Sequence, residues 1–206
     1  GSEMCIRDRY AIAKFYNEKE FSDTHGVGTL DAIIFRYAEV LLIRAEAGAE
    51  LGKDPELDLT VNALRKRVGF NVKLTSSPAT DPKLVAKHPI IKGTNADLIR
   101  EIRRERRVEL FGEGLRYADL MRWGCGERLV APKAGMMLYT DVYTPEEIAV
   151  LKTEVGTYAD GSLDVYGKRV TTPAIFESPK HYLFSLPLNE MALNPKLKPT
   201  NPGWGD

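Results

Sequence analysis

Residues 100–124 read REIRRERRVELFGEGLRYADLMRWG, and seven of them are arginines. Such a run could bind a polyanion, because Lys and Arg neutralise phosphates, or it could belong to a catalytic cluster or to a scaffold. Between Asp97 and Trp123 the seven arginines are accompanied by six acidic residues, which leaves a net charge of +1. The whole chain is also balanced, with 29 Lys+Arg and 29 Asp+Glu. This balance argues against nucleic acid as a partner.

The acidic residues of this stretch are spaced for ion pairs on a helix. They recur at every fourth position from Asp97 to Glu113. Four Arg–acid pairs lie three residues apart and are predicted to interact: Glu101–Arg104, Arg106–Glu109, Arg116–Asp119 and Asp119–Arg122. Apolar residues among the charges predict one apolar helix side, and arginine forks match carboxylates in partly buried networks. We interpret the stretch as a structural ion-pair network, with ligand contact and catalysis as alternatives; its members are Glu105, Arg106, Arg107, Glu109, Glu113, Arg116, Asp119 and Arg122.

Few residues outside the arginine stretch have the spacing of a catalytic or metal-binding site. Cys5 and Cys125 form no CxxC motif, which excludes a disulfide framework and a Cys-rich zinc site. The scattered histidines, among them His88, are interpreted as loop or surface residues. Carboxylates are numerous enough for a glycosidase pair. Acids beside arginines are nevertheless poor general acids, because arginine lowers the pKa that a general acid needs raised. We predict a protein that is not an enzyme and has no metal or cofactor.

The elements that must position the arginine stretch are helices. Apolar spacing predicts a helix over 31–51 and a second one over 54–69, which together form a helical hairpin of tetratricopeptide-like size over 31–69. Residues 70–94 are predicted to be a surface loop. The helix that carries the arginines should start after Thr94 or Asn95 and break at Gly112 and Gly114, before a shorter helical piece that extends to about Trp123.

The C-terminal part is predicted to be less regular. Thr144 and Glu147 predict a capping box for a helix over 144–156, and the Asp-Gly pair that follows predicts a short β-hairpin. An apolar strand and a turn are expected in HYLFSLPLNEMALNP, and a tail without regular structure after it. The predicted fold class is therefore mainly α, with a tetratricopeptide-like hairpin, further helices, short β-hairpins and long irregular loops.

The N-terminus contains no recognisable signal peptide, and SEMCIRDR resembles a translated sequencing-adapter remnant. We expect residues 1–9 to be an artefact or disordered and 10–206 to be the domain, with the natural N-terminus missing. No stretch approaches the roughly 18–20 apolar residues of a membrane span. A single helical hairpin also indicates missing repeats or packing against something else, because solenoid repeats bury their faces against neighbours.

Four motifs in order resemble the C-terminal part of the SusD/RagB family. They are R-Y-A-E-x-L-L, N-x-x-R-x-R, E-R-R-x-E-L-x-x-E-G-x-R-x-x-D-L-x-R-W, and P-L-x-E-x-x-x-N-P before a terminal N-P-G-W. The resemblance covers roughly residues 10–206. It departs from the family at a proline in the tail, LKPTNPGW, where glutamine commonly precedes N-P-G. Family members are much longer, so this chain is expected to be a fragment that lacks most of the N-terminal half.

The resemblance implies a lipoprotein on the outer face of the outer membrane of Bacteroidota. Its partner would be a SusC-like TonB-dependent transporter, its ligand an oligosaccharide or a peptide, and its membrane contact a lipid anchor on the missing N-terminus. Sugars stack on aromatic rings, so the loop residues Tyr139, Tyr143, Tyr158 and Tyr166 are candidate ligand contacts, although loop anchoring is the alternative for each. A tetratricopeptide-like protein–protein adaptor and a glycoside hydrolase are the alternative functions.

Overall fold

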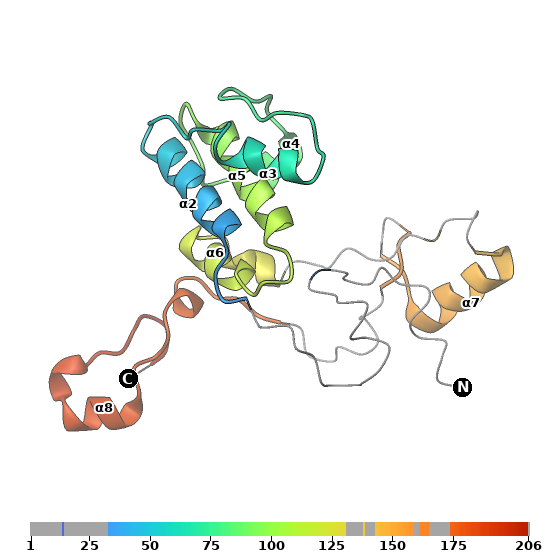
Figure 1. The fold of residues 1–206 in the computed structure, drawn as a ribbon. Coiled ribbons are helices and arrows are strands. Elements are labelled where there is room, and N and C mark those ends of the chain that lie inside the picture. The colour runs from blue at the N-terminus through green and yellow to red at the C-terminus, as the bar shows by residue number, and fades with distance from the viewer. Residues whose placement is uncertain are drawn as a thin grey trace, which may run out of the picture. The chain divides into compact units, whose positions relative to one another are not determined.

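The computed structural model describes residues 14, 33–130, 138, 143–158, 161–164 and 174–205. The described chain is mainly helical, as predicted (Figure 1). It divides into two compact units, Gly1–Arg116 and Tyr117–Asp206. The helices of the first unit are α2 (Tyr37–Glu50), α3 (Val61–Arg67), α4 (Pro82–Lys87) and α5 (Ala96–Glu109). The remaining helices are α6 (Arg116–Arg122), α7 (Pro145–Val155) and α8 (Leu188–Leu193), with short 3-10 turns η1 (Gly126–Leu129), η2 (Lys180–Tyr182) and η3 (Pro195–Leu197).

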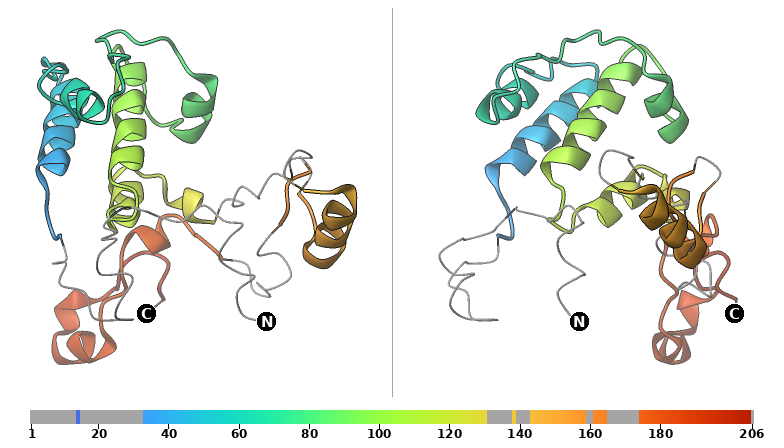
Figure 2. Two further views of the ribbon diagram at one scale, coloured as in Figure 1. Left: turned by 45° about the vertical axis from the view of Figure 1, so that its right-hand side comes forward. Right: turned by 90° about the vertical axis from the view of Figure 1, so that its right-hand side faces the viewer.

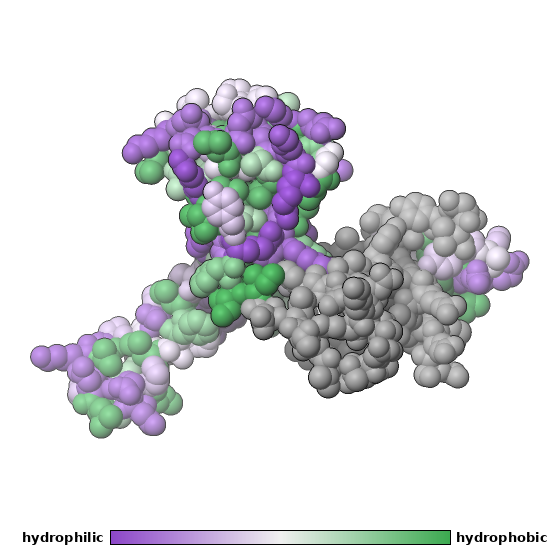
Figure 3. All heavy atoms as spheres, in the orientation of Figure 1, coloured by the Kyte–Doolittle hydropathy of each residue, from purple (hydrophilic) through white to green (hydrophobic). Residues whose placement is uncertain are grey.

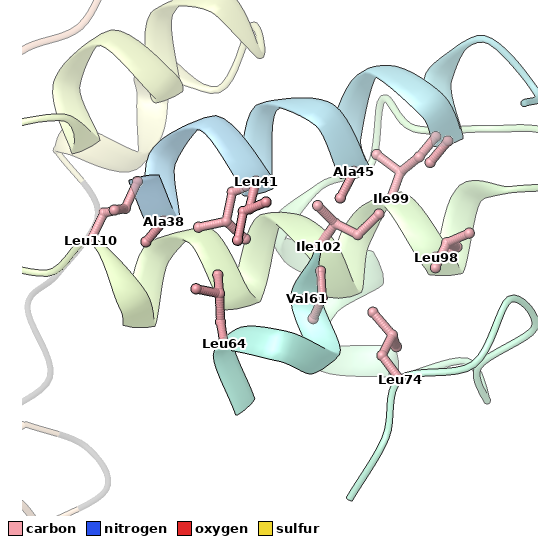
Figure 4. Packing of buried hydrophobic residues seen from close by; sticks show 12 residues of the cluster. Ala38, Leu41, Ala45, Val61, Leu64, Leu74, Leu98, Ile99, Ile102 and Leu110 are labelled. Carbon is pink, nitrogen blue, oxygen red and sulfur yellow. The ribbon is translucent and has the colours of Figure 1, made fainter. Parts of the chain in front are cut away.

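The first unit is built on the pair α2 and α5, which lie side by side in every view (Figures 1 and 2). Small residues such as Ala45 and Ala49 are buried on α2 and let the two helices approach closely. Leu42 and Ile102 are fully buried, which stabilises the fold by about 1.5–3 kcal/mol per side chain. Figure 4 shows the core, which consists of Ala38, Leu41, Leu42, Ala45, Ala49, Val61, Leu64, Leu74, Leu98, Ile99, Ile102 and Leu110.

Both helices of the predicted hairpin are shorter than expected: α2 begins at Tyr37 and not at residue 31, and α3 begins at Val61 and not near residue 55. Asp54 does not start a helix: its Oδ1 accepts a hydrogen bond from the backbone N–H of Glu56 at 2.8 Å. Glu56 has a φ of 49°, a left-handed conformation that a right-handed helix cannot contain. The helix ends as predicted before Gly69, which has a φ of 77°.

The surface loop predicted over 70–94 contains a helix, α4, so that prediction was wrong in part. Asp81 caps it, since its side chain accepts a hydrogen bond from the N–H of Lys83 at 2.8 Å, and Pro82 takes the first helical position. His88 follows the helix and is only 4% exposed, which corrects its interpretation as a loop or surface residue.

The predicted break in the arginine stretch is confirmed. α5 ends at Glu109, Gly112 and Gly114 have φ values of 80° and 79°, and α6 begins at Arg116. Both glycines adopt the left-handed region, where a residue with a Cβ is strained. Trp123, after α6, is 5% exposed and packs in a small apolar cluster with Leu120 and Cys125.

In the second unit the helix predicted over 144–156 is present as α7, with its capping box. The N–H of Thr144 donates to Glu147 Oε2 at 2.8 Å, and the N–H of Glu147 donates to Thr144 Oγ1 at 3.3 Å. Of the predicted β-hairpin, the described residues contain one antiparallel bridge between Thr157 and Leu163. The apolar strand expected in HYLFSLPLNEMALNP is not formed: the segment begins within η2, continues irregularly over 183–187, and forms the helix α8 where the turn was predicted. The tail contains η3, so these expectations were wrong.

Candidate functional site

The strongest cluster of functional groups in the first unit surrounds Arg36, which precedes α2. Its guanidinium holds Glu113 with two parallel hydrogen bonds, from Nε to Oε2 and from Nη2 to Oε1, both 2.7 Å long. The same group donates from Nη1 to Glu109 Oε1 at 2.5 Å and from Nη2 to the Glu109 carbonyl at 2.6 Å. A planar fork suits this bidentate geometry, which an ammonium group cannot reproduce.

Lys14 completes this cluster from the N-terminal side of the chain. Its ammonium donates to the carbonyls of Glu109 at 2.7 Å and Phe111 at 3.0 Å, and it also pairs with the Glu113 carboxylate. The carbonyls at the end of a helix have no partner inside the helix, and the helix dipole is negative there. Arg36 and Lys14 therefore cap the C-terminal end of α5 with two positive charges.

Two arginines of α5 reach across to acids of α2. Arg103 donates from Nε to Glu46 Oε1 at 3.1 Å and from Nη2 to Glu50 Oε1 at 2.9 Å. Arg106 pairs with Glu39 at 3.3 Å. Since the α5 residue numbers rise as those of α2 fall, the helices are antiparallel. Both arginines are buried, so these pairs link the helices within the packed interface.

α3 is joined to α5 in the same way. Arg65 donates from Nε at 3.0 Å and Nη2 at 2.7 Å to Glu105 Oε2, and from Nη1 to the Val72 carbonyl at 3.0 Å. Arg67 donates to Glu109 Oε1 at 2.6 Å. Glu109 therefore accepts from arginines of two other segments, and the acids of α5 act as the shared partners of this unit.

The pairs predicted within one helix are a minor part of the observed network. Asp119 pairs with Arg122 at 3.0 Å, and Glu101 pairs with Arg104. Arg106 and Glu109 were expected to pair with each other, whereas each has partners on other segments. Arg107 is exposed and forms no ion pair with a residue that the structure describes. Arg116 begins α6 and makes at least one interaction of its own.

Sequence reasoning missed the cations that complete the network, above all Arg36, Arg65 and Arg103 as partners between segments. The signal for the first two was present, since Arg36 opens the R-Y-A-E motif and Arg65 lies in N-x-x-R-x-R. Which carboxylate each arginine meets depends on how the helices pack, and a spacing within one helix does not contain that information.

Burial and charge act on the carboxylates in opposite directions. At Glu113 burial disfavours ionisation, but the hydrogen bonds from Arg36 and Lys14 outweigh it and hold the pKa below its ordinary value. At Glu101 burial is the largest cause and raises the pKa, although Arg104 and Arg65 oppose it. The arginine neighbours lower the pKa of Glu101 as expected, but burial outweighs them, so the net pKa of this acid is raised.

The structure describes two of the four candidate tyrosines. Tyr143 is half-buried just before α7, and Tyr158 is half-buried beside the Thr157–Leu163 bridge, where its N–H donates to the Ser162 carbonyl at 2.8 Å. Tyr139 and Tyr166, as well as residues 1–9, lie outside the described residues.

A second aromatic group in the second unit was not predicted. Phe176 packs edge-on against Tyr182, with ring centroids 4.9 Å apart, and Trp204 Nε1 donates to the Leu183 carbonyl at 2.8 Å. The Tyr182 hydroxyl accepts from the N–H of Gly126 at 2.8 Å and donates to Glu127 at 3.1 Å. The hydrogen bonds of Tyr182 join the segment around η2 to η1, and Trp204 packs against the same segment.

Among the described residues, no group of three or more His, Cys, Asp or Glu side chains could hold a metal ion. In the same part of the chain no helix has the length and apolar character needed to cross a membrane. The ion pairs of the first unit connect its own segments.

Comparison with known proteins identifies the family. The sequence model of the SusD family matches residues 7–204, and the chain belongs to this family. It is similar to the SusD-like protein P2 of Formosa agariphila, with 28% identity over 208 residues that cover 98% of this chain and 32% of that protein. The SusD-like protein P38 of the same organism is 36% identical over 104 residues, or 50% of this chain and 19% of that protein.

The chain thus spans about a third of the length of P2, since the match covers 32% of it. No solved structure matches the chain.

Proposed function

We propose that this chain is part of a protein that binds nutrients at the cell surface, takes up oligosaccharides or peptides without chemically changing them, and delivers them to a SusC-like TonB-dependent transporter. The observation that carries the proposal is the match to the SusD family over residues 7–204. The role, the outer-membrane location and the lipid anchor are what membership of this family implies.

The chemistry of the first unit is compatible with a scaffold for binding. Glu105, Glu109 and Glu113 are held by arginines from other segments, and at Glu113 these contacts keep the pKa low. A carboxylate in this state is a poor proton donor. Ligand contact is proposed for the tyrosines of the second half of the chain, because aromatic rings offer flat apolar faces to sugars.

Calorimetric titration of the full-length protein with a panel of oligosaccharides and peptides tests the proposal. We expect saturable binding of at least one ligand, no release of reducing sugar, and co-purification with a SusC-like transporter. Tyr143→Ala and Tyr158→Ala should each weaken ligand binding, whereas Tyr37→Ala, a change of an exposed tyrosine on α2, should not. Release of reducing sugar would instead favour the glycoside hydrolase, for which the raised pKa of Glu101 would be the starting point.

A protein–protein adaptor is the second candidate. The observation in its favour is the exposed apolar surface of α2, on which Tyr37 and Val40 are 74% and 55% exposed. An adaptor would capture a partner protein through this surface in the full-length protein. The substitution Val40→Glu would then abolish partner binding and leave ligand binding unchanged.

A further inference from the structure

The residues that follow α3 form an extended segment, 70–75, which is held against that helix. Leu74 donates its N–H to Asn62 Oδ1 at 2.8 Å, and its carbonyl accepts from Asn62 Nδ2 at 3.1 Å. The Val72 carbonyl accepts from Arg65 Nη1 at 3.0 Å, and Leu74 is buried in the core (Figure 4). Hydrogen bonds at every second residue on one side are the alternation of an extended chain. Asn62 and Arg65, from the N-x-x-R-x-R motif, therefore hold the inner edge of this segment.

The residues between these positions turn their peptide groups to the other side. Asn71, Lys73 and Thr75 are exposed, and their backbone N–H and C=O groups bond to no residue that the structure describes. We name these three residues the outer edge. Free donors and acceptors at every second residue are a template for another extended chain, whose own groups repeat at the same spacing of about 6.6–6.8 Å.

We propose that the outer edge binds an extended peptide as an added antiparallel strand, with an acidic side chain opposite Lys73. The inference rests on the proposed function and names a peptide as the ligand class. Lys73 pairs with Asp58 at 3.0 Å, but the two side chains are 69% and 71% exposed. Such an exposed pair contributes little to stability, so a carboxylate of the peptide can take the place of Asp58.

The side chains beside the outer edge define the rest of the peptide. Successive residues of a strand point to opposite faces, so the peptide residues on either side of the acid share the face of Phe70 and Val72. These two side chains are 51% and 64% exposed, and the guanidinium carbon of Arg65 lies 5.3 Å from the centre of the Phe70 ring. Figure 3 shows apolar side chains among charged ones on the surface of the first unit. We therefore expect an apolar–acidic–apolar pattern in the peptide.

Charge favours an acidic peptide over a second copy of this chain. Residues 61–75 contain basic side chains and no acidic one. Arg65 and Arg67 are paired with acids of α5, whereas Lys66 is exposed and forms no ion pair with a residue that the structure describes. Two copies that paired through their outer edges in antiparallel fashion would place Lys73 opposite Lys73 of the other copy, and like charges directly opposite each other destabilise a strand pair.

Fluorescence anisotropy with the full-length protein and a labelled peptide, Thr-Val-Glu-Val-Thr, tests the proposal. Methylation of the Glu nitrogen removes the N–H that would donate to the Lys73 carbonyl, whereas methylation of the nitrogen of the next Val removes an N–H that points away from the edge. We expect the first change to weaken binding about tenfold and the second at most about twofold.

A charge exchange places the peptide on the outer edge. Lys73→Glu should weaken binding of the Glu peptide about fivefold and strengthen binding of Thr-Val-Lys-Val-Thr by a similar factor. Lys53→Glu is the matched control, because Lys53 is another exposed lysine of the first unit, and it should change neither affinity. Lys73 is itself exposed, so its replacement leaves the core intact.

Four results would overturn the proposal. Equal affinities of the two methylated peptides would exclude strand addition, and an unchanged affinity of Lys73→Glu would exclude this edge. Slow amide exchange at Lys73 of the full-length protein without peptide would assign the edge to another segment of the same polypeptide. Binding of oligosaccharides but of none of the peptides would refute the inference and leave the proposed function standing, whereas binding of neither would refute both.

Discussion

The substitution Arg36→Ala tests whether the ion-pair network holds the first unit together. Arg36 is the residue through which the start of α2 is joined to the end of α5. Its removal deletes the two parallel hydrogen bonds to Glu113 and the bonds to the side chain and carbonyl of Glu109. The substitution therefore acts on two carboxylates at once.

The magnitude follows from burial. The side chains of Arg36, Glu109 and Glu113 are 17%, 12% and 9% exposed, so the two carboxylates would be left in a largely dry site. Loss of one partner of a buried pair costs about 3–5 kcal/mol. Glu109 keeps Arg67 and Glu113 keeps Lys14, so we expect the lower end of this range, about 3 kcal/mol. Arg44→Ala is the matched control, because Arg44 is also an arginine of this region, pairs with Glu56 and is 59% exposed, and such pairs contribute about 0–1 kcal/mol.

The assay is urea unfolding followed by circular dichroism. With a slope of about 2 kcal/mol/M, a loss of 3 kcal/mol moves the midpoint by about 1.5 M, against less than about 0.5 M for Arg44→Ala. If the two variants unfold at the same urea concentration, the network does not stabilise the unit. The double variant Arg36→Ala with Glu113→Gln supplies a second check. Its cost should be clearly smaller than the sum of the single costs, since both changes break the same bonds.

Other predictions concern pH, capping and packing. The pKa of Glu113 is lowered in the folded state. The stability that Glu113 contributes is therefore present above its ordinary pKa and is lost as the pH falls through its folded-state pKa. We expect Glu113→Gln to lose less stability than the parent protein on acidification. The stability contributed by Glu101 depends on pH in the opposite direction, because its pKa is raised in the folded state. This contribution is present at low pH and is lost as the pH rises through the folded-state pKa. We expect Glu101→Gln to stabilise the fold more at pH 7 than at pH 4. Thr144→Ala removes the capping box and should weaken α7 by about 1 kcal/mol, measured as faster amide exchange over its first turn. Gly126→Ala places a Cβ inside the space of the Phe176 ring and should cost about 1–3 kcal/mol in thermal unfolding.

Each of these has a control. Urea midpoints at pH 7 and pH 4 for Glu154→Gln, an exposed acid of α7, give the background pH response. For the cap, Thr144→Ser retains a hydroxyl and should restore slow exchange; equal exchange in the alanine and serine variants would contradict the capping role. For Gly126, the added change Phe176→Leu should recover part of the lost stability, and no recovery would mean that the clash is not the cause.

Local signals predicted much of the fold when the deciding interaction lay within one segment. The capping box of α7 and the glycine break after α5 involve residues a few positions apart, and both were predicted from the sequence. The Asp-Pro pair, which is a signal for the start of a helix, occurs twice and was ambiguous, because its outcome depends on residues beyond the pair. It starts α4 at Asp81, but at Asp54 the left-handed Glu56 ends the local pattern, and nothing in the short sequence distinguishes the two cases.

The sequence by itself determined the helical class, the family, and the fact that the arginine stretch is matched by acids. These properties depend on composition, on spacing and on motifs in order, all of which are local. Only the tertiary structure decided which charges meet. Arg103 finds Glu46, 57 positions away, and Arg36 finds Glu113, 77 positions away, because antiparallel packing of α2 and α5 brings together residues that no periodicity relates. The tertiary structure likewise showed that burial outweighs the arginines at Glu101, since the cost of removing a charge from water depends on what surrounds it in space.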